Sequence, residues 1–395
     1  MDIGTKVARA VGAAALAAAS LVAGSASAQL RELQLTFDEF DHINPIWGPD
    51  LVPLCDERGD YIAYEYVDFN GKHQLAIQQF RIGGGLTAPV LLTDPVIGAD
   101  NRAPQFAPSG TFVVYERSVA EGPSQIYLVN LDSVTTAFPP EVPIAVGDAQ
   151  HRNPRISPDG TIVVYEKKRR LDTTWQIWSY CLVCGEETRR SLDSAQEYGS
   201  IAWAPNSASF VCTRTKWGPG SPTEVVRYDF NPTPDRVAEQ VLTAETGTTT
   251  FANPKWTIDD VDYGQYILAS RRAGPLAPWH LVQVAQDGSF SVQQLTGRGE
   301  LECLENDAIW SYENASAGPE NSKKLVATAT RMQNGQTIVV RVMNSLRDTV
   351  PRCPQLLQLS GVGGMNPRWD PNNTNAIYQK KVGDHWQIFI LDAVF

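Results

Sequence analysis

Two histidines and one glutamate stand at matching places of a repeated pattern, and imidazole and carboxylate groups are metal ligands. His42, His151 and Glu305 each lie three residues before the proline-like position of their repeat. If the repeats close into a ring, the three side chains could converge on one opening and hold a divalent metal ion. The spacing is not that of a compact ligand motif, and loop histidines often bond only to nearby backbone. We therefore predict no metal site and no cofactor.

Arg155 and Arg368 occupy equivalent positions of two repeats, and a guanidinium group binds a carboxylate with good geometry. With a histidine as base or metal ligand, they could act on a uronate sugar by elimination, in which a cation neutralises the carboxylate and a base removes the α-proton. Packing within the repeat explains the same arginines. The sequence has no Gly-x-Ser-x-Gly elbow. A binding protein without catalytic residues is therefore the main hypothesis, and a metal-dependent uronate lyase is the alternative.

Basic residues and tryptophans gather in the loops that join the second and third strands of the repeats. Such loops share one end of the fold that we expect, where they would form a partner-binding face for an envelope or extracellular protein or an anionic glycan. Charged loops that serve only solubility are the alternative interpretation. The candidate residues are Lys167, Lys168, Arg169, Arg170, Trp217, Arg271, Arg272, Lys380, Lys381 and Trp386.

A repeat of about fifty residues positions these side chains. Residues 153–165 have the pattern of a strand, a tight turn and a strand, and a third strand follows at 175–180. The same order recurs at 103–115 and 124–129, with weaker copies elsewhere. One apolar anchor marks the first strand of each copy: Trp47, Phe106, Ile156, Trp203, Trp256, Trp310 and Trp369. Four short strands per repeat predict an all-β fold, a β-propeller.

The ends of the chain predict how the ring closes. The last copy stops after its third strand, Trp386–Ile390, whereas an additional apolar strand, Leu33–Thr36, precedes the first copy. We expect this N-terminal strand to complete the last blade, because closure leaves no exposed sheet edge. The prediction is a seven-bladed β-propeller.

Two copies carry a more specific resemblance. Ser157-Pro-Asp-Gly160 with Gln176-Ile-Trp178, and Pro108-Ser-Gly110 with Gln125-Ile-Tyr127, resemble the TolB-type, WD-like β-propeller repeats of bacterial envelope proteins. The resemblance covers nearly all of the chain after residue 28 and is strong in these two copies. It implies the propeller alone, since TolB places an α/β domain before its six blades and this chain has no room for one.

Composition and the first residues restrict the class of protein. The 395 residues include 33 Lys+Arg and 44 Asp+Glu, a net charge of −11, which argues against nucleic-acid binding. Lys6 and Arg9 precede an apolar run at 10–24 and then Ala26-Ser-Ala28, the pattern of a secretory signal peptide over residues 1–28. Residues 29–395 would then be one domain, periplasmic or secreted, without a membrane span.

Six cysteines in an exported chain favour disulfides over free thiols. Cys181 and Cys184 flank a turn that brings their Cα atoms within bonding reach, so we expect a bridge there. Cys212 lies within a strand and is predicted to be a buried thiol. The pairing of the others, Cys55, Cys303 and Cys353, stays open.

Overall fold

The structure is a computed structural model. It describes residues 31–49, 61–81, 85–95, 98–120, 122–131, 138–216, 221–230, 237–244, 247–257, 266–296, 310–317, 325–332, 336–342, 356–358, 360, 363–369 and 375–392. The regular elements in these ranges are β-strands. No helix within them is long and apolar enough to cross a membrane. The predicted signal peptide lies outside the described residues.

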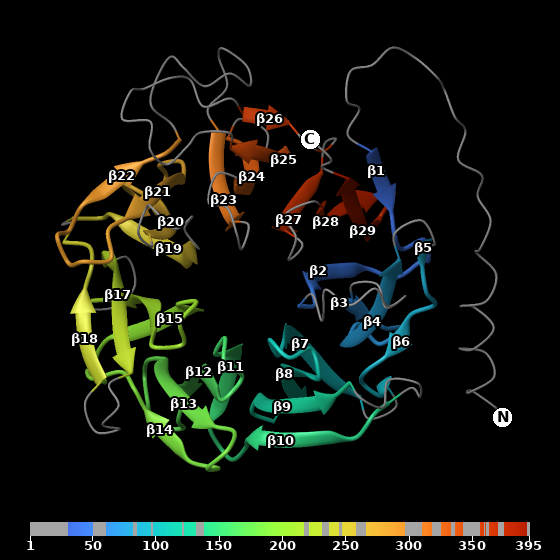
Figure 1. The fold of residues 1–395 in the computed structure, drawn as a ribbon, viewed down its shortest axis with the longest axis horizontal. Coiled ribbons are helices and arrows are strands. Elements are labelled where there is room, and N and C mark those ends of the chain that lie inside the picture. Colours follow the sequence, from blue (N-terminus) through green and yellow to red (C-terminus); the bar gives the residue numbers. More distant parts are fainter. Residues whose placement is uncertain are drawn as a thin grey trace.

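The strands pair as antiparallel groups in chain order (Figure 1). The first three groups are β2 (His42–Trp47), β3 (Tyr61–Val67), β4 (His73–Arg81), β5 (Gly85–Leu86) and β6 (Val90–Leu91); β7 (Ala99–Phe106), β8 (Phe112–Val119), β9 (Gln125–Asn130) and β10 (Glu141–Ala145); and β11 (Gln150–Ile156), β12 (Ile162–Lys168), β13 (Gln176–Cys181) and β14 (Glu187–Arg189).

Two further groups share one eight-stranded sheet, joined by a single parallel pair, Thr223 with Thr250. They are β15 (Glu197–Trp203), β16 (Ser209–Thr215), β17 (Thr223–Phe230) and β18 (Val237–Val241), and β19 (Thr250–Thr257), β20 (Tyr266–Arg272), β21 (His280–Val284) and β22 (Val292–Gln294). The remaining strands are β23 (Trp310–Ala317), β24 (Leu325–Arg331), β25 (Thr337–Val342) and β26 (Leu356–Gln358), and β27 (Gly364–Trp369), β28 (Asn375–Val382) and β29 (His385–Asp392) with β1 (Arg31–Gln34).

The groups follow one another around a common centre, with the first strand of each inside and the last strand outside (Figure 1). Apolar side chains fill the spaces between neighbouring groups. One cluster joins the two ends of the chain, because Leu35, Ile377 and Ile390 pack with Trp47 and Ile62. Strand alternation turns one face of each sheet to each neighbour, so every inner sheet face is buried.

Each inner strand contains the same irregularity. The pairing register shifts between the inner strand and its neighbour in β2, β7, β11, β15, β19, β23 and β27. In six of these strands, all but β23, a residue with a left-handed backbone lies inside the shift, such as Asn153 with φ of 52°. Asparagine tolerates this conformation better than most residues, which explains the repeated Asn-Pro dipeptides before the anchors. The bulge also breaks strict alternation, so inner-strand residues three apart face the same side.

The register corrects one sequence prediction. Trp310 was expected to be the anchor of its repeat, but it pairs with Arg331 at the start of β23. The shift in β23 lies between Glu313 and Ser316, and Ala317 therefore takes the anchor position. A small residue at this position gives no apolar signal, whereas a tryptophan nearby gives a strong one.

The N-terminal strand pairs with the C-terminal one. Leu33 of β1 is opposite Ile390 of β29, as the sequence predicted for residues 33–36. The buried Thr36 hydroxyl then accepts a hydrogen bond from the Ile388 N–H at 2.9 Å. Equivalent hydroxyls in four other groups accept the same bond from the third strand: Thr93 from Leu75, Ser191 from Ile177, Thr243 from Val225 and Thr296 from Leu281.

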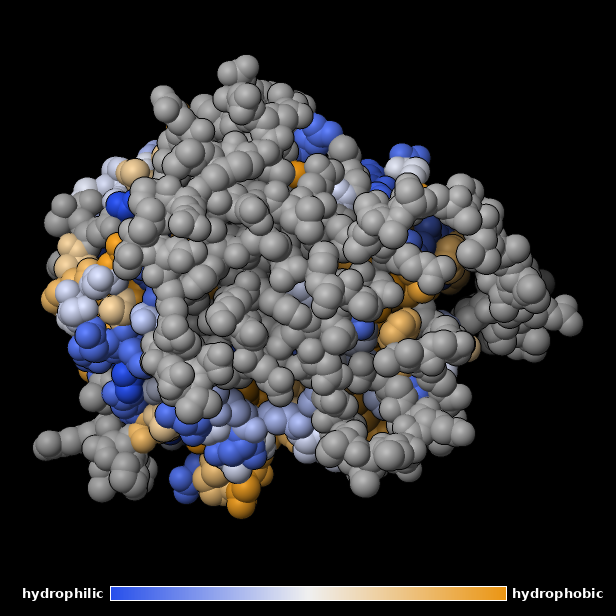
Figure 2. Space-filling model, turned by 45° about the horizontal axis from the view of Figure 1, so that its top comes forward, coloured by the Kyte–Doolittle hydropathy of each residue, from blue (hydrophilic) through white to orange (hydrophobic). Residues whose placement is uncertain are grey.

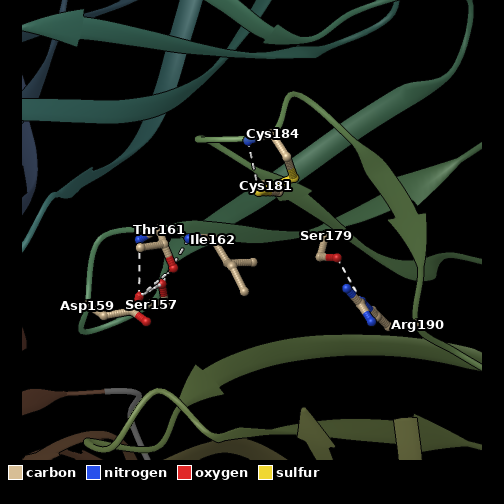
Figure 3. The surroundings of a disulfide bond; sticks show 8 residues. All are labelled: Ser157, Asp159, Thr161, Ile162, Ser179, Cys181, Cys184 and Arg190. Atoms are coloured by element: carbon tan, nitrogen blue, oxygen red, sulfur yellow. Dashed lines mark hydrogen bonds between the residues drawn. A yellow bond between two sulfur atoms is a disulfide. The ribbon is translucent and has the colours of Figure 1, made fainter. Parts of the chain in front are cut away.

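The turn of the best-matching repeat is held by its own side chains (Figure 3). Asp159 Oδ1 accepts the Ser157 hydroxyl at 2.6 Å and the Thr161 N–H at 3.1 Å, and Gly160 has a positive φ of 74°. Ser157-Pro-Asp-Gly160 is therefore a structural turn.

Cysteine chemistry follows the predictions where the structure describes it. Cys181 and Cys184 form a disulfide across the turn between β13 and β14, with Cα atoms 5.5 Å apart (Figure 3). Cys212 is a buried free thiol, and burial raises its pKa. Cys55, Cys303 and Cys353 lie outside the described residues.

Candidate functional site

Two of the predicted partner-binding cations have partners within their own sheet. Lys167 is buried, and its Nζ lies 2.6 Å from Glu187 Oε2 and 4.5 Å from the centre of the Trp178 ring. Lys380 Nζ lies 2.9 Å from Glu32 Oε1 and 5.1 Å from the centre of the Phe389 ring. Both lysines thus join the second strand to the outermost strand of their sheet.

A tyrosine completes this arrangement, which we call the strand clip. Its hydroxyl donates to the same glutamate that pairs with the cation two residues later in the strand. Three clips are Tyr115, Arg117 and Glu141; Tyr165, Lys167 and Glu187; and Tyr378, Lys380 and Glu32. The sequence signal was present, as Tyr-x-Lys/Arg in the second strand and a glutamate in the outermost strand of the same group.

The other predicted cations differ in their surroundings. Arg169 pairs with Asp172 at 3.0 Å, and Arg272 lies 4.5 Å from the centre of the Trp279 ring. Arg271 is half-buried, and so is Trp386, whose backbone N–H donates to Asp41. Trp217 lies outside the described residues. In the described ranges, Lys168, Arg170 and Lys381 have no acidic group within salt-bridge distance, and Arg170 and Lys381 are exposed.

Exposed apolar side chains accompany these cations, a feature that our sequence analysis did not predict. Phe69, Leu171 and Leu276 are 76%, 93% and 90% exposed, and each lies in a loop between the second and third strands of its group. Val119, Met332 and Val382 are also exposed beside such loops. We call this end of the molecule, with the loops after β3, β8, β12, β20, β24 and β28, the loop face. Figure 2 shows apolar and hydrophilic residues side by side on the coloured part of one view.

The histidines proposed as metal ligands are buried within the sheets. The His42 ring packs 5.2 Å from that of Tyr64, and its Nε2 lies 2.6 Å from Asp38 Oδ1. The His151 Nδ1–H donates to the Ser124 carbonyl at 3.1 Å, and burial lowers the pKa of His151. Glu305 lies outside the described residues. Within the described part of the chain, no three His, Cys, Asp or Glu side chains are grouped to hold a metal ion.

A cavity of about 650 Å³ lies at the centre of the ring and is lined mainly by inner-strand residues. Neither His42 nor His151 lines it. Its carboxylates are Glu65 and Glu116. Glu65 Oε2 lies 2.8 Å from His73 Nδ1, and Glu116 Oε2 accepts the Asn153 N–H at 3.4 Å. Burial raises the pKa of Glu116 to about 7, because its effect is larger than that of the hydrogen bond from Asn153, which lowers the pKa.

Besides Arg102, three further cations line this cavity. Arg155 and Arg368, the equivalent arginines of the sequence analysis, both reach it, and so does Lys255. Burial lowers the pKa of all three groups. Lys255 was missed, although it follows an Asn-Pro dipeptide as both arginines do.

No protein-family model matches the sequence, and no curated protein matches it at a significant level. The structure is similar to that of an oligogalacturonate lyase from Vibrio parahaemolyticus, with a TM-score of 0.58 and 11% identity over 92% of this chain and 94% of that one. It is similar to the β-propeller domain of the Trilobed protease from Pyrococcus furiosus, with a TM-score of 0.55 and 13% identity over 91% and 95%. A putative TolB from Agrobacterium tumefaciens gives a TM-score of 0.49 and 16% identity over 77% and 93%. Identities this low establish the fold alone, which is that of a β-propeller.

Proposed function

We propose that the chain is a closed, seven-bladed propeller whose last blade is completed by β1. Two contacts of β1 support this. Glu32 makes the strand clip with Tyr378 and Lys380, as outermost-strand glutamates do in other groups. Thr36 accepts the third-strand N–H as Thr93 does.

Contacts between the first and last groups support the same closure. The left-handed residue of an inner strand donates its N–H to a polar side chain of the preceding group. Ala103 donates to Glu65 at 2.9 Å and Ser200 to Glu166 at 3.0 Å. Asn44 of the first group donates to Gln379 of the last at 2.8 Å, which repeats this contact across the ends of the chain.

We further propose that the protein is an exported binding scaffold without catalytic residues, which uses the loop face to bind an acidic envelope or extracellular protein. One observation supports this: large apolar side chains, nearly fully exposed at Leu171 and Leu276, lie on the same face as the cations Lys168, Arg170 and Lys381. Exposed apolar side chains gain free energy when a partner covers them, and adjacent cations select acidic partners. An anionic glycan would use the cations but gain less from aliphatic side chains.

Site-specific photo-crosslinking in the native host tests this proposal. A photoreactive residue is placed at position 171 or 276 on the loop face, and at Val183 as the matched control. Val183 is 84% exposed, but it lies in the turn between β13 and β14, at the opposite end of the molecule. We expect one protein adduct from the loop face and none from position 183. Equal labelling at all three positions, or none at 171 and 276, would refute the loop face.

A second candidate function, a uronate lyase, is favoured by a separate observation. Arg155, Arg368 and Glu116, whose pKa is near 7, line the same cavity. A guanidinium could neutralise the uronate carboxylate while Glu116 removes the α-proton and the glycosidic oxygen leaves. The similar structure from Vibrio parahaemolyticus is that of an oligogalacturonate lyase. His42 and His151, the candidates for metal ligand or base, are not among the residues that line the cavity.

Elimination creates an unsaturated sugar that absorbs ultraviolet light, so a panel of uronate polysaccharides with and without divalent metals gives a direct assay. Activity that disappears in Glu116→Gln would establish the lyase. A flat trace for the unmodified protein would reject this candidate and leave the scaffold.

A further inference from the structure

We propose that the central cavity binds a small multivalent oxyanion, a polycarboxylate or a phosphate, between Arg155, Lys255 and Arg368. This site is distinct from the loop face, and it requires no catalysis. Three cations from three different groups of strands line the same cavity, which has a volume of about 650 Å³. Because a water molecule occupies about 30 Å³, there is room for such an anion with several waters.

The three cations lie at one level of the ring. Each is the first paired residue after the bulge of its inner strand, where Arg155 pairs with Val164, Lys255 with Leu268 and Arg368 with Ile377. The register fixes the residues at this level in all inner strands as Ile46, Gln105, Arg155, Ala202, Lys255, Ser316 and Arg368. None of these residues is acidic, so the level carries three basic side chains and no acidic one.

The carboxylates of the cavity lie at another level. Glu65 and Glu116 are two residues further along the second strand, about 7 Å at the usual rise of a strand. Glu65 is already engaged with His73 and with the N–H of Ala103. Glu116 shares its surroundings with Arg102, which itself pairs with Asp100 at 2.9 Å.

The guanidinium groups of Arg155 and Arg368 make the same hydrogen bond to the backbone. Arg155 Nη1 donates to the Pro154 carbonyl at 2.8 Å, and Arg368 Nη1 donates to the Pro367 carbonyl at 2.9 Å. In the described part of the chain, neither arginine has a carboxylate within salt-bridge distance, although Glu166 favours the charged form of Arg155 from a greater distance. Their remaining N–H groups are therefore available to oxygen atoms of a ligand.

Electrostatics disfavours this cluster without an anion. Burial and then the charges of Arg368 and Arg155 lower the pKa of Lys255. Burial and the charge of Arg155 lower the pKa of Arg368 to about 10. Like charges that repel one another across a cavity are relieved by a multivalent anion, and a single monovalent anion neutralises only one of them.

Calorimetric titration of the full chain with inorganic phosphate, citrate and acetate tests the proposal, with ionic strength held constant by sodium chloride. We expect phosphate or citrate to bind at one site and acetate to bind at least about tenfold more weakly. Tighter citrate binding would assign the ligand to the polycarboxylates, and tighter phosphate binding to the phosphates. The absence of saturable binding by either anion would overturn the proposal.

Variants distinguish a site from general attraction to a basic surface. Lys255→Met should weaken anion binding by about tenfold or more, whereas Lys255→Arg should largely restore it. Lys381→Met, which removes an exposed cation from the loop face, is the matched control and should leave the affinity unchanged. Equal loss of binding in both methionine variants would show adventitious attraction only.

Discussion

The half-buried carboxyl of Glu116 should make the stability of the protein fall as the pH rises from about 4.5 to about 7. Its pKa is raised from the usual 4.5 to about 7, chiefly by burial. In this window the unfolded chain has lost its proton while the folded protein keeps it, so the free energy of unfolding decreases with pH and is constant again above about 7. Glu116→Gln is nearly isosteric, can still accept the Asn153 N–H, and removes this dependence.

The size of the effect follows from the pKa difference. At about 1.4 kcal/mol per pKa unit, the difference between 4.5 and about 7 gives an upper bound of about 3.5 kcal/mol. Water in the cavity screens part of this, and we expect about 1–2 kcal/mol. The free energy of unfolding of Glu116→Gln, minus that of the unmodified protein, should therefore increase by this amount as the pH rises from about 4.5 to about 7.

Urea unfolding of both proteins across this pH range measures the difference directly. Glu186→Gln, which neutralises an exposed carboxyl outside the cavity, controls for a general change in net charge. A stability difference for Glu116→Gln that stays constant with pH, or that shrinks as the pH rises, would refute the reasoning.

Three further changes have defined outcomes. Thr36→Val removes the acceptor of the buried Ile388 N–H and should lower the free energy of unfolding by about 1–2 kcal/mol in chemical denaturation; an unchanged midpoint would contradict the role of β1. Replacing Cys181 and Cys184 by serine should lower the free energy of unfolding by less than about 2 kcal/mol, because the disulfide closes a short loop. A larger loss in chemical denaturation would contradict this. Leu171→Ser should leave the stability within about 0.5 kcal/mol yet weaken partner crosslinking, and a marked loss of stability would show that Leu171 serves packing.

Local patterns in the sequence predicted the strands, the order of the repeats, the pairing of residues 33–36 with the C-terminal strand and the Cys181–Cys184 bridge. Turn residues and β-branched runs encode such features within a few neighbouring positions. The direction in which a side chain points was harder to predict. From the sequence alone, Lys167 is expected to be an exposed loop cation, because its partner Glu187 lies twenty residues later in the chain.

The bulge in each inner strand explains why the sequence did not predict all the residues that line the cavity. Strict alternation would place inner-strand residues three apart on opposite faces, but Arg102 and Gln105 both line the cavity. The extra residue in the bulge lets side chains on both sides of it, such as Arg102 and Gln105, face the cavity. The sequence showed the Asn-Pro dipeptides but not that they mark a bulge, so the cation level was recognised at Arg155 and Arg368 and missed at Lys255.

The left-handed position in the bulge of β7 offers a stabilising substitution. Ala103 has a left-handed backbone with φ of 52°, where three of its counterparts are Asn44, Asn153 and Asn366. A left-handed alanine costs about 1 kcal/mol, whereas asparagine tolerates the conformation. Ala103 lines the open cavity, so a larger side chain has space. Ala103→Asn should therefore raise the free energy of unfolding by about 0.5–1 kcal/mol, and Ala107→Asn, at a fully buried position, should lower it. If denaturation showed Ala103→Asn to be destabilising, the bulge would not require a left-handed residue at this position, and the shared level of the three cations would need another cause.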